Sequence, residues 1–137
     1  MKPRILVIED NEQNMYLTTY LLEKHGYEVV QARTGAEGIE LAQQVQPHLI
    51  ILDIQLPLMD GYAVARALRE HAALREVPIV AVTSCAMLGD RERILAMGCN
   101  GYLEKPINPD TFTSEIQNHL TVRSRQGVEH DNDPGRG

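Results

Sequence analysis

Short apolar runs recur along the chain and are separated by longer stretches in which apolar and polar residues mix. Runs rich in Ile, Leu and Val stand at residues 5–8, 49–52 and 79–82, with weaker ones at 27–32 and 102–104. Runs this short are typical of strands, and continuous rather than alternating apolarity favours strands buried on both faces of a parallel sheet. The pattern therefore predicts a parallel sheet with one strand at each run.

The stretches between the runs carry helix signals. Asn11 is a preferred capping residue and Gly26 a preferred left-handed terminator, so a helix is expected between them. Thr34-Gly35-Ala36-Glu37 has the spacing of a capping box, and Pro47 follows the helix that it opens. Further helices are expected after Gly61, over residues 88–97 before Gly98, and over 111–120, which Asn108-Pro109 introduces.

Strand and helix signals alternate up to residue 120, which predicts a doubly wound α/β domain. Right-handed crossovers between parallel strands place helices on both faces of such a sheet. Residues 121–137 lack this periodicity, so we expect a disordered tail or the remnant of a linker there. The predicted organisation is one domain over residues 1–120 and then that tail. The total length of 137 residues fits one domain of ordinary size.

Composition and charge narrow the classes of function. The formal net charge is −6 and no cluster of Lys and Arg occurs, so direct binding of nucleic acid is not expected. The N-terminus leads into the first strand without a signal-peptide core, and no apolar stretch approaches the ~20 residues of a membrane span. We therefore expect a soluble, cytoplasmic protein without membrane insertion.

Neither the cysteines nor the histidines form a recognisable site. Cys85 and Cys99 lack the spacing of a redox or zinc motif and are interpreted as reduced thiols. The histidines are scattered, mostly near predicted helix ends or in the tail, and are interpreted as surface residues: His25, His48, His71, His119 and His130. Zinc binding is therefore not expected.

Four of the predicted strands end on residues that can handle a phosphoryl group. Glu9-Asp10, Asp53, Thr83 and Lys105 each follow or close one of these runs. Because the carboxyl ends of parallel strands share one edge of the sheet, where open α/β sheets bind their ligands, these side chains are expected to be neighbours.

Three carboxylates in one crevice repel each other unless a cation binds between them. Oxygen ligands of this kind suit Mg²⁺ or Ca²⁺, and Mg²⁺ keeps positions open for phosphate oxygens. Lys105 could then place a point charge on a phosphoryl group, and Thr83 could donate a hydrogen bond to it. Asp53 stands alone at the end of the central, most apolar run, so it is the best candidate nucleophile for an aspartyl phosphate.

These motifs, at this spacing, resemble the receiver domain of two-component response regulators over about Lys2 to Leu120. The matching pieces are Glu9-Asp10, Asp53 with Leu56-Pro57 and Met59-Asp60-Gly61, Thr83-Ser84, and Lys105-Pro106. The resemblance implies a flavodoxin-like fold with strand order 2-1-3-4-5 and a role as a phosphorelay response regulator. Because no output domain is recognisable, the chain looks like a single-domain receiver of the chemotaxis or DivK-like type.

The resemblance also implies roles for individual residues. Asp53 matches the phosphoacceptor, which takes its phosphoryl group from a phosphohistidine of a sensor histidine kinase or a histidine phosphotransfer protein. Mg²⁺ is the implied cofactor, with Asp10 and Asp53 as direct ligands. Glu9 matches the acid that holds a metal-bound water, and Gln55 the position whose backbone carbonyl completes the site.

Further positions match the groups that respond to phosphorylation. Thr83 and Lys105 match the residues that bind the phosphoryl oxygens, and Tyr102 matches the switch aromatic that turns inward when Thr83 moves. Pro106 matches a position that often follows a cis peptide bond. A downstream protein target would respond to the altered surface. No turnover of a separate substrate is expected beyond the chain's own phosphoryl transfer and autodephosphorylation.

The chain departs from the family pattern in places. Glu9 stands where the family more often has Asp, and its longer side chain can still hold a metal-bound water. Gln55 and Cys85 occupy positions that tune the lifetime of the phosphoryl group. From the residues alone, Tyr102 could equally be a strand aromatic packed permanently in the core. Met15 is a candidate partner contact, because the first helix of receivers meets the histidine-bearing partner.

Three alternatives remain open at this point. A haloacid-dehalogenase-like Mg²⁺ phosphatase also uses an aspartyl nucleophile, but it is expected to carry DxD where this chain has Glu9-Asp10-Asn11. A binding module of flavodoxin type would have a small, hydroxyl-rich phosphate loop after its first strand, where these acids would repel the ligand. The chain could also be the receiver fragment of a larger regulator.

Overall fold

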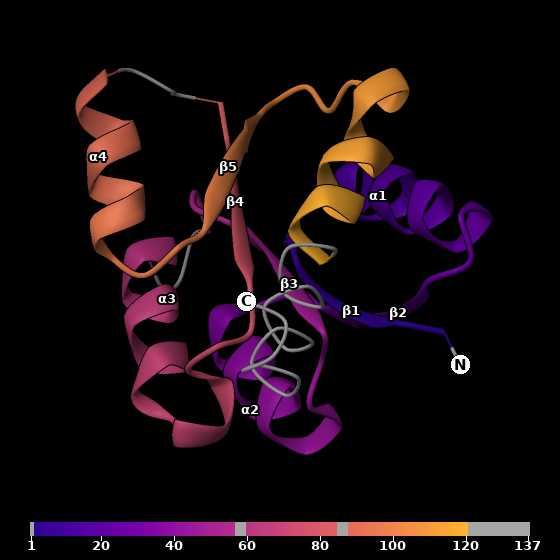
Figure 1. The fold of residues 1–137 in the computed structure, drawn as a ribbon. Helices are drawn as coiled ribbons and strands as arrows, with labels where there is room; N and C mark the ends of the chain where they lie inside the picture. The colour runs from indigo at the N-terminus through magenta and orange to yellow at the C-terminus, as the bar shows by residue number, and fades with distance from the viewer. Residues whose placement is uncertain (1, 57–59, 85–87, 121–137) are drawn as a thin grey trace, which may run out of the picture.

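A computed structural model describes residues 2–56, 60–84 and 88–120 (Figure 1). One sheet contains the parallel strands β1 (Arg4–Ile8), β2 (Glu28–Ala32), β3 (Leu49–Asp53), β4 (Ile79–Thr83) and β5 (Gly101–Glu104). Their order across the sheet is β2-β1-β3-β4-β5. The predicted fold class and strand order are therefore confirmed.

Helices connect the strands. They are α1 (Glu12–Lys24), α2 (Gly35–Val45), α3 (Gly61–Glu70), a short 3₁₀ turn η1 (Ala72–Leu74), α4 (Leu88–Ala96) and a C-terminal helix over residues 109–120. Figure 1 shows α1 beside the C-terminal helix and α2 beside α3 on the other side of the sheet. Within the described ranges, no helix has both the length and the apolarity that crossing a bilayer requires.

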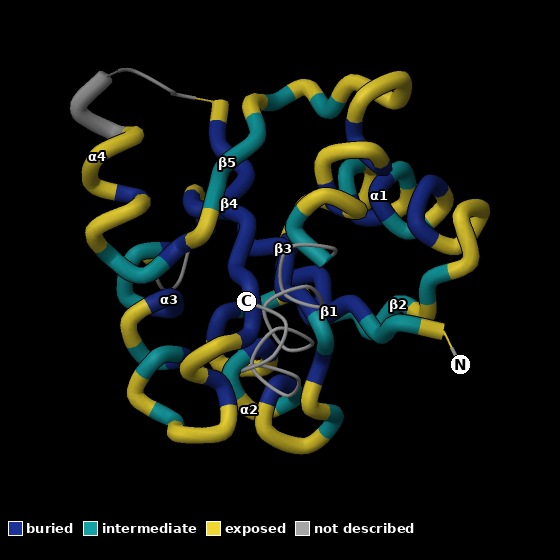
Figure 2. Tube along the Cα trace, in the orientation of Figure 1, coloured by how far each residue is buried: buried dark blue, intermediate teal, exposed yellow. Residues whose placement is uncertain are grey.

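Two separate cores explain why the strands are continuously apolar. Leu6, Ile8 and Ile50 pack on one face of the sheet, with residues of α2, α3 and α4. Ile5 and Val7 pack on the other face, with residues of α1 and the C-terminal helix. Since successive strand side chains point to opposite faces, every position of β3 and β4 is buried, as the dark tube in Figure 2 shows.

The helix ends follow the predicted signals. The Asn11 side chain accepts a hydrogen bond from the Asn14 N–H (2.9 Å), and the Thr34 hydroxyl accepts one from the Glu37 N–H (3.1 Å). Gly26 closes α1 in the left-handed region at a φ of 90°. Each capping group satisfies a backbone donor that the helix itself leaves unpaired.

One sequence-based interpretation is wrong. Met15 is 1% exposed in the core beneath α1, so it is not available as a partner contact. Of the histidines interpreted as surface residues, His25 is exposed, and His48, His71 and His119 are half-buried. The His48 Nδ1 atom accepts a hydrogen bond from the Arg4 N–H at 2.9 Å, which attaches the start of β3 to β1. Pro57, Met59, Cys85 and the predicted tail over 121–137 lie outside the described residues.

The strand register brings the predicted site residues to one edge. Ile8 pairs with Leu52, Asp53 with Val82, and Thr83 with Glu104. Each strand therefore ends at nearly the same level, and the residues that follow share the carboxyl edge of the sheet.

Candidate functional site

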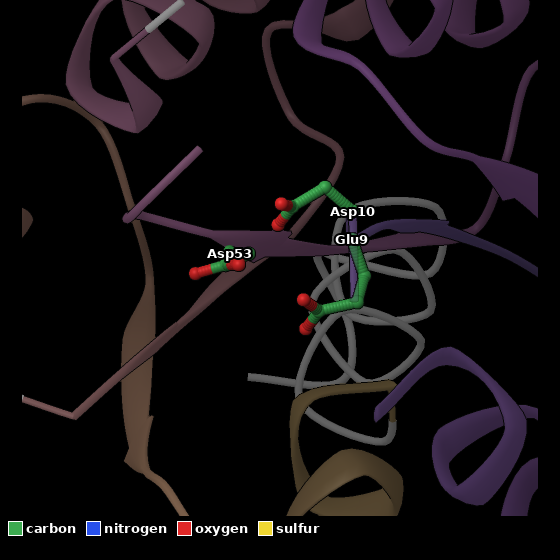
Figure 3. A group of neighbouring side chains, drawn as sticks. All are labelled: Glu9, Asp10 and Asp53. Atoms are coloured by element: carbon green, nitrogen blue, oxygen red, sulfur yellow. The ribbon is translucent and has the colours of Figure 1, made fainter. Parts of the chain in front are cut away.

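The acids of β1 and β3 converge at this edge (Figure 3). Glu9 and Asp10 come directly after β1, and Asp53 is the last residue of β3. One carboxylate oxygen from each lies within 4.8 Å of the others, and Figure 3 shows the three side chains around a common space. Glu9 is 4% exposed and Asp53 is 2% exposed, whereas Asp10 faces solvent. The cluster thus meets solvent at Asp10.

Lys105 supplies a positive charge beside this cluster. Its Nζ atom lies 3.2 Å from Asp53 Oδ2 and 3.8 Å from Glu9 Oε1. The Lys105 backbone N–H donates to the Thr83 carbonyl at 2.8 Å, which extends the pairing of β5 with β4 by one residue. The following Lys105–Pro106 peptide bond is cis. Lys105, which directly follows β5, therefore reaches acids at the ends of β1 and β3.

One ammonium does not balance the carboxylates. Burial, hydrogen bonding to Asp53 and the negative charge of that carboxylate together raise the pKa of Glu9 to about 7, against the opposing effects of Lys105 and the Asn11 N–H. A buried carboxyl group whose pKa is raised this far is stabilised either by a proton or by a further cation. The donor set is made of carboxylate oxygens, which suits a hard cation such as Mg²⁺. Glu9, Asp10 and Asp53 can hold such an ion.

A chain of hydrogen bonds links Asp53 to the end of β4. Asp53 Oδ1 accepts a hydrogen bond from the Gln55 N–H at 2.9 Å. The Gln55 side-chain oxygen in turn accepts from the Ser84 N–H (3.2 Å) and from the Ser84 hydroxyl (2.7 Å). Thr83, just before Ser84, is 3% exposed. Sequence reasoning singled out Gln55 for its backbone carbonyl and missed this side-chain bridge.

Tyr102 lies on β5 and is half-buried. Its ring packs against the core on the α3 and α4 side of the sheet, and its hydroxyl accepts hydrogen bonds from Arg91 Nε (3.0 Å) and Nη2 (2.8 Å). The ring is therefore neither permanently enclosed in the core nor free on the surface. Sequence reasoning did not single out Arg91, since an arginine on an exposed helix face carries no motif.

Comparison with protein families identifies the domain that carries this site. Residues 5–117 match the response regulator receiver domain family. The chain belongs to this family. Its function is that of a response-regulator receiver in phosphorelay signal transduction, as the sequence motifs predict. The match covers most of the chain and favours this function over the dehalogenase-like and flavodoxin-type alternatives.

Individual relatives also belong to this kind of protein. The chain is 42% identical over 120 residues to the polar-differentiation response regulator DivK of Brucella ovis, covering 88% of this chain and 98% of that protein. The solved structure of the Vibrio cholerae chemotaxis protein CheY4 matches with a TM-score of 0.83 and 28% identity, covering 86% of this chain and 98% of the other. The receiver domain is thus similar to both single-domain types that the motifs suggested.

A further solved structure bears on the metal. The receiver domain of the sensor histidine kinase PA1611 from Pseudomonas aeruginosa matches with a TM-score of 0.82 and 33% identity, over 88% of this chain and 99% of that one. That protein holds a magnesium ion coordinated in its active site cleft. In the chain described here, the corresponding chemistry is available from the cluster of Glu9, Asp10 and Asp53.

Proposed function

We propose that this receiver accepts its phosphoryl group on Asp53, from a phosphohistidine of a sensor histidine kinase or a histidine phosphotransfer protein. The observation that carries the proposal is the position of Lys105 Nζ, 3.2 Å from the Asp53 carboxylate and beside the acid cluster. A fixed cation next to a nearly buried carboxylate is suited to stabilising the negative charge that a phosphoryl group brings.

The transfer needs few protein groups. A carboxylate oxygen of Asp53 attacks the phosphorus while the P–N bond to the donor histidine breaks. The electron pair of that bond stays on the imidazole, which leaves neutral because its other ring nitrogen carries a proton. Asp53 then holds an acyl phosphate, whose oxygens accept hydrogen bonds from the Lys105 ammonium and the Thr83 hydroxyl.

We assign the cofactor Mg²⁺ to the acid cluster. Asp10 and Asp53 would be the direct ligands, Glu9 would act through a water, and Gln55 would contribute its backbone carbonyl. When bound, Mg²⁺ supplies charge neutralisation to the acids and to the phosphoryl oxygens. The support lies in the approach of the three carboxylates to within 4.8 Å and in the raised pKa of Glu9, about 7.

The output is a change of protein-binding surface. Thr83 moves toward the new phosphoryl group and Tyr102 turns inward, which alters the face formed by α4, β5 and the C-terminal helix. A downstream protein target in the cytoplasm binds the two states with different affinity, and phosphorylation shifts their populations. The functional unit is residues 1–120.

Labelling of matched variants tests the acceptor. Wild-type protein incubated with Mg²⁺ and radiolabelled acetyl phosphate is expected to take up label, and Asp53→Asn is expected to take up none. Asp110→Asn is the matched control, because Asp110 is an exposed carboxylate at the start of the C-terminal helix. It should label like the wild type, and a chelator should abolish labelling in both. Uptake by Asp53→Asn at the wild-type level would overturn the assignment.

A further inference from the structure

Arg91 on α4 makes a close, two-part contact with Tyr102 on β5. Its Nε and Nη2 atoms both donate to the Tyr102 hydroxyl, at 3.0 and 2.8 Å. The guanidinium carbon also lies 5.4 Å from the centroid of the Tyr102 ring, within the range of a cation–π interaction. The arginine therefore engages the hydroxyl end of the tyrosine, with its charge within cation–π range of the ring.

This contact is one of several that join α4 to the rest of the domain. Of residues 91–96, Ile94 alone is buried. A second arginine of the same helix, Arg93, lies 4.1 Å above the ring of Tyr62 on α3. Figure 1 shows α4 at the outer edge of the molecule, next to β5. Over the part of α4 whose side chains are described, residues 91–96, these arginine–tyrosine contacts add to the packing of Ile94.

We propose that Arg91 is a positioning residue that holds Tyr102 in the half-buried position described above, here called the outward state, and thereby limits how readily the unphosphorylated domain switches. The inference rests on the proposed function, in which Tyr102 is the switch residue. The inward movement of the Tyr102 ring requires the loss of both hydrogen bonds and of the cation–π contact. Arg91 thus stabilises one of the two states through contacts that the other state lacks, which is the requirement for shifting their populations.

The effect of removing Arg91 follows from the size of these contacts. A guanidinium–hydroxyl hydrogen bond at an exposed site, combined with an exposed cation–π contact, changes an equilibrium by roughly three- to tenfold. Arg91→Ala is therefore expected to raise the inward population of Tyr102 by roughly three- to tenfold without phosphorylation. Arg91→Lys keeps the charge but loses the forked donor geometry, so it should restore part of the wild-type behaviour.

Carbon–proton NMR of ring-labelled tyrosine measures this directly. The chain has five tyrosines, and Tyr102→Phe identifies the signal of Tyr102. The signal of the free wild-type protein marks the outward state, and its position with beryllofluoride and Mg²⁺, which mimic phosphorylation at Asp53, marks the inward state. In free Arg91→Ala the signal should move toward the beryllofluoride position, with Arg91→Lys in between.

Arg93→Ala is the matched control, since it removes the same type of contact from the same helix but leaves Tyr102 untouched. Its Tyr102 signal should coincide with that of the wild type. If Arg91→Ala also coincides with the wild type while beryllofluoride still moves the signal in both, the role of Arg91 is refuted and the proposed function stands. If beryllofluoride moves no Tyr102 signal even in the wild type, Tyr102 is not a switch, and the role of Arg91 fails together with the proposed switching of Tyr102, whereas phosphorylation of Asp53 is tested separately by labelling.

A kinetic measurement distinguishes an effect of Arg91 that acts through Tyr102 from a general loosening of α4. The initial rate of labelling by acetyl phosphate should rise by roughly three- to tenfold in Arg91→Ala, because more of the protein is in the receptive state. In a Tyr102→Ala background the same substitution should change the rate by less than about twofold, since the contact is already absent. An equal rise in both backgrounds would show that Arg91 acts independently of Tyr102.

Discussion

Lys105 and Asp53 form an ion pair that is largely closed to solvent, with Nζ 3.2 Å from Oδ2 and the Asp53 side chain only 2% exposed. Glu9 also lies beside the same ammonium, at 3.8 Å. The lysine therefore offsets the repulsion between acids that the fold places together. This arrangement links the stability of the domain to the chemistry of its site.

Removal of this ammonium should make stability more dependent on Mg²⁺. Lys105→Met leaves the buried carboxylates without their cation, which is expected to lower the free energy of unfolding by about 1–3 kcal/mol in the absence of metal. Because the acids then repel more strongly, added Mg²⁺ should stabilise the variant more than the wild type. Urea titrations with and without MgCl₂ measure both effects. Lys2→Met, at an exposed lysine, is the control and should behave like the wild type.

Arg69 should be among the most important residues for stability. Its guanidinium donates hydrogen bonds of 2.7–3.1 Å to five acceptors. One is the side-chain oxygen of Asn100, and the others are the backbone carbonyls of Leu74, Arg75, Val77 and Gly98. Arg69→Ala is expected to lower the free energy of unfolding by about 2–4 kcal/mol, since several acceptors lose their donor at once.

Denaturant unfolding of a matched variant at Arg66 is the control for the prediction at Arg69. Arg66 lies on the same helix, is exposed, and contacts the Met97 sulfur at 3.4 Å. Arg66→Ala should change the free energy of unfolding by less than about 0.5 kcal/mol. Equal losses in the two variants would contradict a special role for the Arg69 network.

Gly61 should not tolerate a side chain. A Cβ atom at this position would meet the backbone of Ile54, coming within 2.7 Å of its carbonyl oxygen. No rotamer change relieves a clash with backbone, so Gly61→Ala should lower the free energy of unfolding by about 2–4 kcal/mol. Since Ile54 directly follows Asp53, labelling by acetyl phosphate should also slow. Ala63→Gly, on the half-buried part of the same helix, should cost only about 1 kcal/mol and leave labelling unchanged.

Cys99 should make stability fall at alkaline pH. Burial raises the pKa of its thiol from 9.0 to about 11, while Arg69 acts weakly in the opposite direction. The folded state therefore favours the neutral thiol. This contribution is complete below pH 9 and is lost as the pH rises to about 11. Two pKa units correspond to about 2–3 kcal/mol.

Unfolding measured across that pH window, in wild type and in Cys99→Ala, isolates the thiol. Tyrosines and lysines titrate in both proteins, so the difference between the two curves reports Cys99 alone. The stability of the wild type should fall more steeply than that of the variant. Parallel curves would mean that the thiol ionises as easily in the folded as in the unfolded chain.

The helix and strand pattern was predictable because it depends on short-range signals. Asn11 and Gly26 mark the ends of α1 through local hydrogen bonding and local backbone geometry, which need no partner elsewhere. The error at Met15 has a physical cause as well. Its apolar side chain fits the helix pattern, but only packing beneath α1 decides that it is 1% exposed rather than available to a partner.

By itself, the sequence determined the alternation of strands and helices, the parallel sheet and the residues at the strand ends. Their convergence follows because parallel strands share one carboxyl edge. Tertiary structure alone decided which long polar side chains meet: Arg91 with Tyr102, the Gln55 side chain with Ser84, and Arg69 with the carbonyls around Gly98. Such side chains are flexible and have many possible partners within reach, so periodicity does not encode their pairing. Their partners are set by how the packed helices are placed on the sheet.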